Sequence, residues 1–133
     1  MNLILSTDKK NIQLDKLKDL LKQTYWANQR QEATIMKSIE HSLCYGVYAD
    51  GQMVGFGRVV TDYATMYWIC DIIVDETYRH QGIGKMIVEA ITQTEEIKGL
   101  LGILATNDAH ELYAKYGFER EPVKCMMKKR SMQ

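Results

Sequence analysis

Residues 1–133 are predicted to form one α/β domain, in which helices flank a mixed, mostly antiparallel central sheet. Three observations support this prediction. Short segments rich in Val, Ile, Tyr and Trp alternate with segments whose apolar residues recur at every third or fourth position. A tight-turn dipeptide, Asp50-Gly51, joins two of the strand-like segments. The single proline, Pro122, lies near the C-terminus, and no repeat or flexible linker divides the chain.

The N-terminal part predicts one strand followed by two helices. The strand covers Leu3–Leu5. Apolar residues then recur at helical spacing twice, first as Leu14, Leu17, Leu21 and Tyr25, and then as Ile35, Met36 and Ile39. Asp15 lies near the start of the first helix, where its negative charge complements the helix dipole.

The middle of the chain predicts three consecutive strands. Asp50-Gly51 connects Leu43–Tyr48 to Met53–Val60 as an antiparallel hairpin. A second turn, over 62–65, leads into Met66–Val74. The Tyr, Trp, Ile and Val residues of this third segment are typical of a strand that is covered on both faces.

The last part predicts a helix, a strand, a short helix and a final strand. One helix face is formed by Ile83, Ile87, Ala90, Ile91 and Thr94. Leu101–Ala105 is the next strand. The short helix that follows carries an apolar stripe of Ala109, Leu112, Tyr113 and Tyr116. A last strand is expected over Phe118–Met127, interrupted by Pro122.

The composition excludes several classes of function. The chain has 17 basic and 17 acidic residues, so its formal net charge of zero argues against a nucleic-acid partner. No apolar run approaches the roughly 20 residues of a spanning helix, and the N-terminus lacks the pattern of a signal peptide. We therefore expect a cytoplasmic protein with no membrane partner. Cys44, Cys70 and Cys125 are widely spaced without ligand neighbours, which predicts reduced thiols and no metal site.

Residues 79–85 predict a binding site for a pyrophosphate or a similar anion. They join a buried strand to the start of a helix, whose unpaired N–H groups and dipole attract anions. Gly82 and Gly84 remove the side chains that would hold a phosphate away from the backbone, and Arg79 and Lys85 add positive charge. The segment lacks residue types that a P-loop or a dinucleotide-binding fingerprint requires.

Two motifs stand out in the second half of the chain. One is Arg79-x-x-Gly82-x-Gly84, and the other is Ala109-x-x-Leu112-Tyr113-x-x-x-Gly117-Phe118. With these motifs and the elements around them, nearly the whole chain resembles the GNAT superfamily of acyl-coenzyme A-dependent N-acyltransferases, as a small single-domain member. The resemblance implies a GNAT-like fold with the element order β-α-α-β-β-β-α-β-α-β.

The resemblance also implies how the acyl donor, acetyl-CoA, would be bound. Arg79 and a run of backbone N–H groups would hold the pyrophosphate, the run being Gln81, Gly82, Ile83, Gly84 and Lys85. The strand before the turn would pair with the pantetheine arm as with an added strand, and would polarise the thioester carbonyl, through the backbone of Ile72, Ile73 and Val74. Asn107 would contact the coenzyme, although Thr106 stands where the family often has asparagine. The fourth and fifth strands are expected to splay apart around the pantetheine.

Two residues are candidates for catalysis. Tyr113 matches the family's usual general acid, which would protonate the departing thiolate, although periodicity alone would make it one aromatic residue of an apolar stripe. Asp71 is a carboxylate inside an apolar strand, where a charge is costly unless it is paired or used. Its side chain is expected to share a face with Ile69 and Ile73. A general base and a structural carboxylate paired with Arg58 both remain open for Asp71, and the amine could instead lose its proton to water.

The acceptor would enter from the side of the first two helices and the hairpin. Trp26 and Tyr63 could wall the acceptor site, while Arg30 could select a carboxylate and Asp62 a cation. Alternatively, Trp26 and Tyr25 only fill the junction between the two helices. The sequence does not identify the acceptor.

The leading prediction is an acetyl-CoA-dependent N-acetyltransferase that acts on a primary amine of a small molecule or a peptide by direct attack. The alternative is a non-catalytic acyl-CoA-binding sensor or interaction module of the same fold, the latter resting on a basic C-terminal tail. The length of the acyl group and a homodimer are left open.

Overall fold

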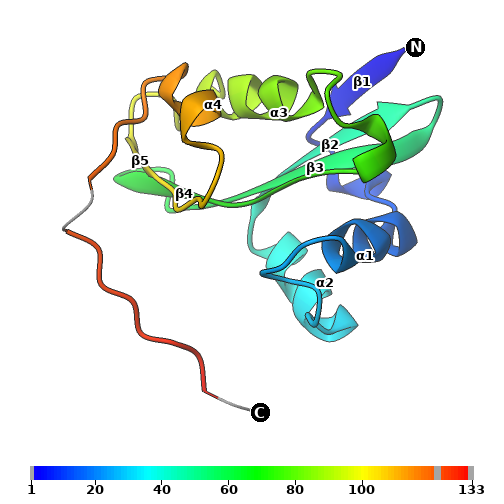
Figure 1. The fold of residues 1–133 in the computed structure, drawn as a ribbon, viewed down its shortest axis with the longest axis horizontal. Helices are drawn as coiled ribbons and strands as arrows, with labels where there is room; N and C mark the ends of the chain where they lie inside the picture. Colours follow the sequence, from blue (N-terminus) through cyan, green and yellow to red (C-terminus); the bar gives the residue numbers. More distant parts are fainter. Residues whose placement is uncertain (1, 122–123, 132–133) are drawn as a thin grey trace.

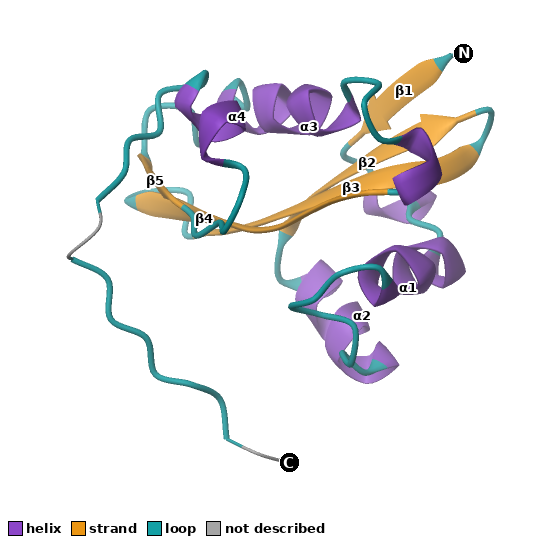
Figure 2. Ribbon diagram, viewed as in Figure 1, coloured by secondary structure: helices purple, strands orange, loops and turns teal. Residues whose placement is uncertain are grey.

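The computed structural model describes residues 2–121 and 124–131 of the chain. Figures 1 and 2 show its helices and strands. In chain order they are β1 Leu3–Ser6, α1 Leu14–Lys22, α2 Glu32–Glu40, β2 Leu43–Ala49, β3 Gln52–Thr61, β4 Met66–Val74, α3 Ile83–Thr92, β5 Leu101–Ile103 and α4 His110–Ala114. Two 3₁₀ turns, η1 Lys9–Asn11 and η2 Glu76–Tyr78, precede α1 and α3.

The strands form one sheet in the order β1-β2-β3-β4-β5. All neighbouring strands are antiparallel except β4 and β5, which are parallel. Asp50 and Gly51 both have positive φ, 51° and 82°, as the two-residue turn of a twisted hairpin requires. The predicted class, a mixed and mostly antiparallel sheet flanked by helices, is confirmed.

Helices cover both faces of the sheet. In Figure 1, α1 and α2 lie on one face, and α3 and α4 lie on the other. Each face has its own apolar core: the isoleucines of α3 pack on one side, and the leucines of α1 pack on the other. The first helix is shorter than expected, because it ends at Lys22, and Tyr25 lies in the following loop with 65% of its surface exposed.

An extra residue in β4 changes which way its side chains point. Arg58 lies opposite Asp71, and the next residue of β3, Val59, lies opposite Ile69, so Cys70 is a bulge. Ile69 therefore belongs to the core under α3, whereas Ile73 belongs to the core under α1. The expectation that Asp71 shares a face with both isoleucines is wrong: it faces the α1 side with Ile73 only.

Beyond the bulge, β4 loses its outer neighbour. The pairing of β4 with β5 is limited to Met66–Trp68 against Leu101–Ile103. Backbone N–H groups alternate between the two sides of a strand, so those of residues 69–74 that point away from β3 have no strand partner within the described residues. The expected separation of the fourth and fifth strands is present in the fold.

The expected last strand is not formed in the described parts of 118–127, and Pro122 lies outside the described residues. Figure 1 shows the C-terminal segment leading away from the domain, and the side chain of Met126 is 97% exposed. Two features of the sequence explain the difference. β5 has only three residues and offers a short edge for pairing, and the run Glu119-Arg120-Glu121 would place a charge on both faces of a strand.

Candidate active site

The turn between η2 and α3 presents a series of backbone N–H groups. Gly82 precedes the helix with φ of 81°, in the left-handed region that glycine adopts without strain, and His80 has φ of 67°. The first hydrogen bond of α3 runs from the N–H of Met86 to the carbonyl of Gly82, at 3.0 Å. The N–H groups of residues 81–85 donate no hydrogen bond within the described part of the chain. These N–H groups lie at the positive end of a ten-residue helix, an arrangement that favours the binding of an anion.

The absence of a side chain at Gly84 leaves unfilled space beside this turn. A Cβ added at Gly84 would meet only the side chains of Leu112 and Val74, both at 3.9 Å, which is ordinary contact. The packing of the protein itself therefore does not require glycine at this position. The space fits the close approach of a ligand to the backbone, which a side chain would prevent.

Tyr113 lies on α4, the helix that follows β5. Its ring is packed edge-to-face on Phe118, with centroids 5.9 Å apart, and the residue is 7% exposed. Burial raises the pKa of Tyr113 to about 12, with a smaller contribution from the negative charge of Asp108. The hydroxyl forms no hydrogen bond among the described residues, yet it is not an orphaned buried group, so it reaches solvent. Burial thus favours the protonated phenol, whose hydroxyl has no hydrogen-bond partner among the described residues.

Asp71 is held by three donors from separate parts of the chain. Its Oδ1 accepts from Trp26 Nε1 at 2.9 Å, and its Oδ2 accepts from Arg30 Nη1 at 3.0 Å and from Arg58 Nε at 2.8 Å. The residue is 2% exposed, and burial by itself would raise the pKa of Asp71. The hydrogen bonds and charges of the two arginines outweigh that effect and hold the pKa below its usual value.

These contacts favour the structural alternative for Asp71. A carboxylate with a lowered pKa and three donors has little tendency to take a proton from an ammonium group. The predicted pair with Arg58 is present, and the structure adds Arg30 and Trp26 to it. The sequence predicts an acceptor-site role for Arg30 and Trp26, but part of each side chain instead supports the carboxylate.

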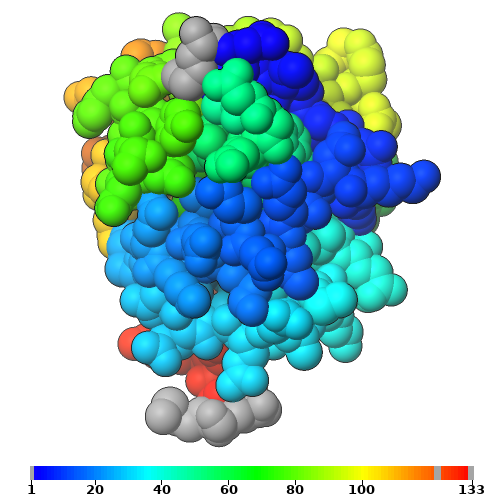
Figure 3. All heavy atoms as spheres, turned by 90° about the vertical axis from the view of Figure 1, so that its right-hand side faces the viewer, coloured from blue at the N-terminus to red at the C-terminus, as the bar shows by residue number. Residues whose placement is uncertain are grey.

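Two contacts tie the loop between α1 and α2 to the coenzyme side of the fold. Asn107, in the loop between β5 and α4, donates from Nδ2 to the hydroxyl of Tyr25 at 2.7 Å. Gln23 Oε1 accepts from the N–H of Glu76 at 3.1 Å. Figure 3 shows the blue segment after α1 adjoining the green segment after β4. The ring of Tyr25 also packs edge-to-face on Trp26, with centroids 5.0 Å apart. No local pattern in the sequence indicates this contact of Tyr25, because its partner Asn107 is 82 residues away.

The turn between β3 and β4 does not join this group. The carboxylate of Asp62 accepts hydrogen bonds from the N–H groups of Ala64, Thr65 and Met66 and from the Thr65 hydroxyl. The hydroxyl and the N–H groups hold the pKa of Asp62 well below its usual range. The expected cation site at Asp62 is not supported, because the carboxylate stabilises its own turn. Tyr63 has φ of 60° in this turn, and no hydrogen bond or ring contact joins it to Trp26 or Arg30 in the described structure.

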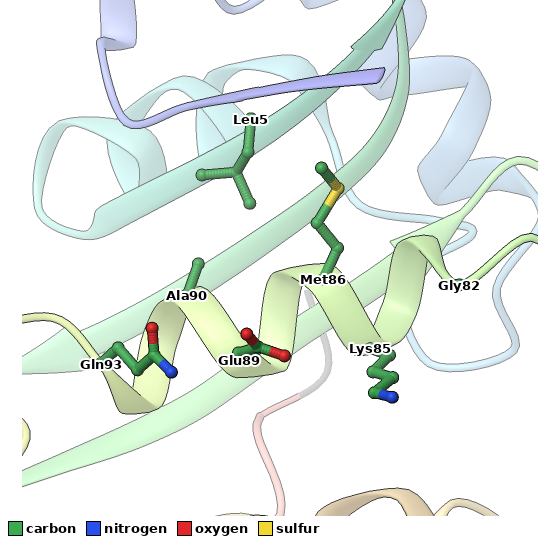
Figure 4. Close-up of a pocket in the computed structure, with 7 residues that line it drawn as sticks. All are labelled: Leu5, Gly82, Lys85, Met86, Glu89, Ala90 and Gln93. Atoms are coloured by element: carbon green, nitrogen blue, oxygen red, sulfur yellow. The ribbon is translucent and has the colours of Figure 1, made fainter. Parts of the chain in front are cut away.

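A hollow of about 400 Å³ lies on the other flank of α3, between this helix and β1. Figure 4 shows Leu5, Met86 and Ala90 around it, with Gly82 and Lys85 at one end. Val74 and Leu112, which adjoin Gly84, do not line it. The hollow is therefore distinct from the open edge of β4, which contains the predicted thioester position.

The described residues contain no cluster of three or more His, Cys, Asp or Glu side chains that could hold a metal ion. Among the helices of the described residues, none has the length and apolar character needed to cross a bilayer.

Residues 40–120 match the family described as acetyltransferase (GNAT) domain. A putative acetyltransferase of the GNAT family from Xanthomonas campestris pv. campestris is 34% identical, with a TM-score of 0.88 and coverage of 99% of this chain and 94% of that one. Histone acetyltransferase TAP1 of Glycine max is 32% identical over 73 residues, which are 53% of this chain and 32% of that protein. This chain thus matches about a third of the length of TAP1.

The structure of AAC(6')-Iy, solved with the bisubstrate analog CoA-S-monomethyl-acetylneamine, has the same fold. The TM-score is 0.74 at 19% identity, with 98% of this chain and 100% of that chain covered. The chain belongs to the GNAT acetyltransferase family.

Proposed function

We propose that this chain is an N-acetyltransferase that moves the acetyl group of acetyl-CoA to the primary amine of a small molecule or peptide by direct attack. One observation carries the proposal. The N–H groups of residues 81–85 have no partner in the described structure, and they follow a strand, β4, whose outer edge beyond Trp68 has no strand partner there. An elongated ligand with a phosphate at one end fits both features.

The turn before α3 and the strand β4 would bind different parts of the coenzyme. The N–H groups of Gln81–Lys85 would hold the pyrophosphate, with positive charge from Arg79 and Lys85. The free backbone edge of Ile72–Val74 would pair with the pantetheine arm. Bound there, acetyl-CoA supplies a thioester carbonyl that an amine can attack. The fold shared with AAC(6')-Iy, which was solved with a CoA-containing analog, supports this placement.

Tyr113 would act on the departing sulfur. A phenol with a pKa of about 12 is a weaker acid than an ordinary thiol, whose pKa is about 8.5. We therefore expect Tyr113 to stabilise the developing thiolate by donating a hydrogen bond rather than by a complete proton transfer. Its hydroxyl is available for this role, because it has no other partner among the described residues.

No residue is assigned as a general base. Asp71 is paired with two arginines, so its carboxylate is not a free proton acceptor. The proposal has the amine lose its proton to water before or during the attack. We place the reaction in a reducing compartment such as the cytoplasm, because Cys44, Cys70 and Cys125 are all free thiols.

Two measurements on the purified chain test the proposal. Thermal unfolding with acetyl-CoA should show a rise in Tm that grows with concentration, since a ligand at 100 times its Kd stabilises a protein by about 2.7 kcal/mol. Thiol release with a panel of primary amines and peptides should then detect turnover. A rise in Tm without thiol release for any acceptor would favour the non-catalytic sensor. Unchanged Tm at millimolar acetyl-CoA would refute both functions.

A further inference from the structure

The cluster around Asp71 contains one negative and two positive charges. Arg30 and Arg58 share the single carboxylate, and their side chains are only 15% and 14% exposed. Arg58 also donates from Nη1 to Ser42 Oγ at 3.1 Å, a neutral partner that leaves the charge uncompensated. The cluster therefore has a net charge of +1.

An uncompensated charge in a mostly buried place is unfavourable, because the surrounding protein groups solvate a charge less well than water does. Each guanidinium has five N–H donors, and the three hydrogen bonds described for these two arginines use only part of them. Every side-chain nitrogen that is fully buried in the described structure has a partner, so the nitrogens without one, Nε and Nη2 of Arg30 and Nη2 of Arg58, reach solvent. Those donors are open to an anion, and a carboxylate would restore neutrality.

The cluster lies beside the place where the thioester is proposed. Asp71 immediately precedes Ile72–Val74, whose outer backbone edge is unpaired. The bulge at Cys70 turns the Asp71 side chain to the α1 side of the sheet, opposite to α3. Trp26, which donates to Asp71, packs on Tyr25, and Tyr25 accepts from Asn107 in the loop that leads to Tyr113. An acceptor that enters from the α1 side would pass the two arginines.

We infer that the acceptor is a small amine that also carries a carboxylate, and that Arg30 and Arg58 bind this carboxylate while its amine faces the thioester. The inference rests on the proposed function, and it names the substrate class of the same site. The two arginines determine specificity, and Asp71 is a positioning residue that fixes their orientation.

The test compares each of several ω-amino acids, such as β-alanine and 4-aminobutyrate, with the amide of the same compound. Because hydrogen bonds to a charged group are worth about 1.5–3 kcal/mol, kcat/KM for the acid should exceed that for the amide by about tenfold to 100-fold. In Arg30→Gln the carboxylate of Asp71 keeps Arg58 and Trp26, but the net charge falls to zero, so the acid-to-amide ratio should fall towards one. A ratio within one preparation does not depend on the fraction that is folded.

Lys18→Gln is the matched control. It also removes one cation, and it breaks the ion pair between Lys18 of α1 and Glu32 of α2, which does not involve Asp71. It should leave the ratio unchanged. The N-acetylated acids and amides, added with CoA, give a second readout through Tm that does not require turnover. Equal values for acid and amide in both assays would overturn the inference while leaving acetyl-CoA binding intact. A ratio that survives in Arg30→Gln would also overturn it.

Discussion

The coenzyme side of the candidate site is built from consecutive backbone, whereas the acceptor side is built from side chains that come together over long distances in the sequence. The N–H groups of residues 81–85 follow one another in a single turn. The cluster around Asp71 collects Trp26 and Arg30 from one loop and Arg58 from β3. Binding in the first region should therefore be lost mainly when added atoms block the backbone, whereas the second region should be sensitive to the loss of a single charge.

The largest effect is expected from Asp71→Asn. This change leaves Arg30 and Arg58 mostly buried without a counter-charge, and breaking a buried ion pair in this way typically costs 3–5 kcal/mol. We expect a loss of about 3 kcal/mol in the free energy of unfolding, measured by urea denaturation. Glu32→Gln, which breaks the exposed pair with Lys18, should cost less than about 1 kcal/mol. Equal losses in the two variants would contradict the account of the cluster.

The same carboxylate predicts a pH dependence. The pKa of Asp71 is lowered in the folded chain relative to about 3.9 in the unfolded chain. Its contribution is therefore fully present above the unfolded value and is lost as the pH falls through the folded value. The difference in unfolding free energy between the native chain and Asp71→Asn should be constant above about pH 5 and shrink below about pH 4. A difference that grows on acidification would have the wrong sign.

The next largest effect is expected from Tyr113→Phe, which tests the coenzyme side. The ring contact with Phe118 is kept, and only the unpaired hydroxyl is lost. Loss of one hydrogen-bond donor to a charge that develops in the transition state typically lowers kcat by about 10²- to 10³-fold, so we expect kcat to fall by about 10²-fold. The Kd of acetyl-CoA, measured by calorimetry, should change by less than about threefold, or about 0.7 kcal/mol. Full activity would refute the assignment of Tyr113.

The smallest effect is expected from Tyr25→Phe, at the contact between the two regions. The variant keeps the packing on Trp26 and removes the acceptor of the Asn107 hydrogen bond. Because Tyr25 is largely exposed, we expect a cost of about 0.5–1 kcal/mol in urea denaturation. A loss comparable to that of Asp71→Asn would show that the loop contact, rather than the ion cluster, holds this side together.

The fold could be predicted from the sequence wherever local patterns determine structure. Asp50-Gly51 forms the expected hairpin turn, and Gly82 precedes α3 as predicted. Both turns require positive φ at one or two positions, which the residue types at those positions can adopt. The bulge at Cys70 left no such signal. Buried and partly exposed residues alternate in β4 without interruption at the bulge. The sequence therefore predicts one face for Ile69, Asp71 and Ile73, whereas Ile69 lies on the opposite face from the other two.

The acceptor side was predicted only in part. The sequence predicts the ion pair of Asp71 with Arg58 as one of two alternatives for this carboxylate, because a charge inside an apolar strand needs a partner. The participation of Arg30 depends on a contact between the α1–α2 loop and β4. The two residues are 41 positions apart, and no local pattern in the sequence indicates that they meet. The final strand was expected from its apolar residues, but the short β5 edge is a property of the assembled sheet.

Calorimetric titration of acetyl-CoA into the native chain, Gly84→Ala and Gly99→Ala tests whether the coenzyme lies against the turn before α3. At Gly84 the new methyl group has room in the protein, and alanine should raise the unfolding free energy by up to about 1 kcal/mol because it favours a helix. Gly99 meets nothing within 4 Å and provides the matched control. We expect Gly84→Ala to weaken acetyl-CoA binding by at least about tenfold, or 1.4 kcal/mol, while Gly99→Ala binds as the native chain does. Native affinity in Gly84→Ala would contradict the claim that the coenzyme lies against this turn.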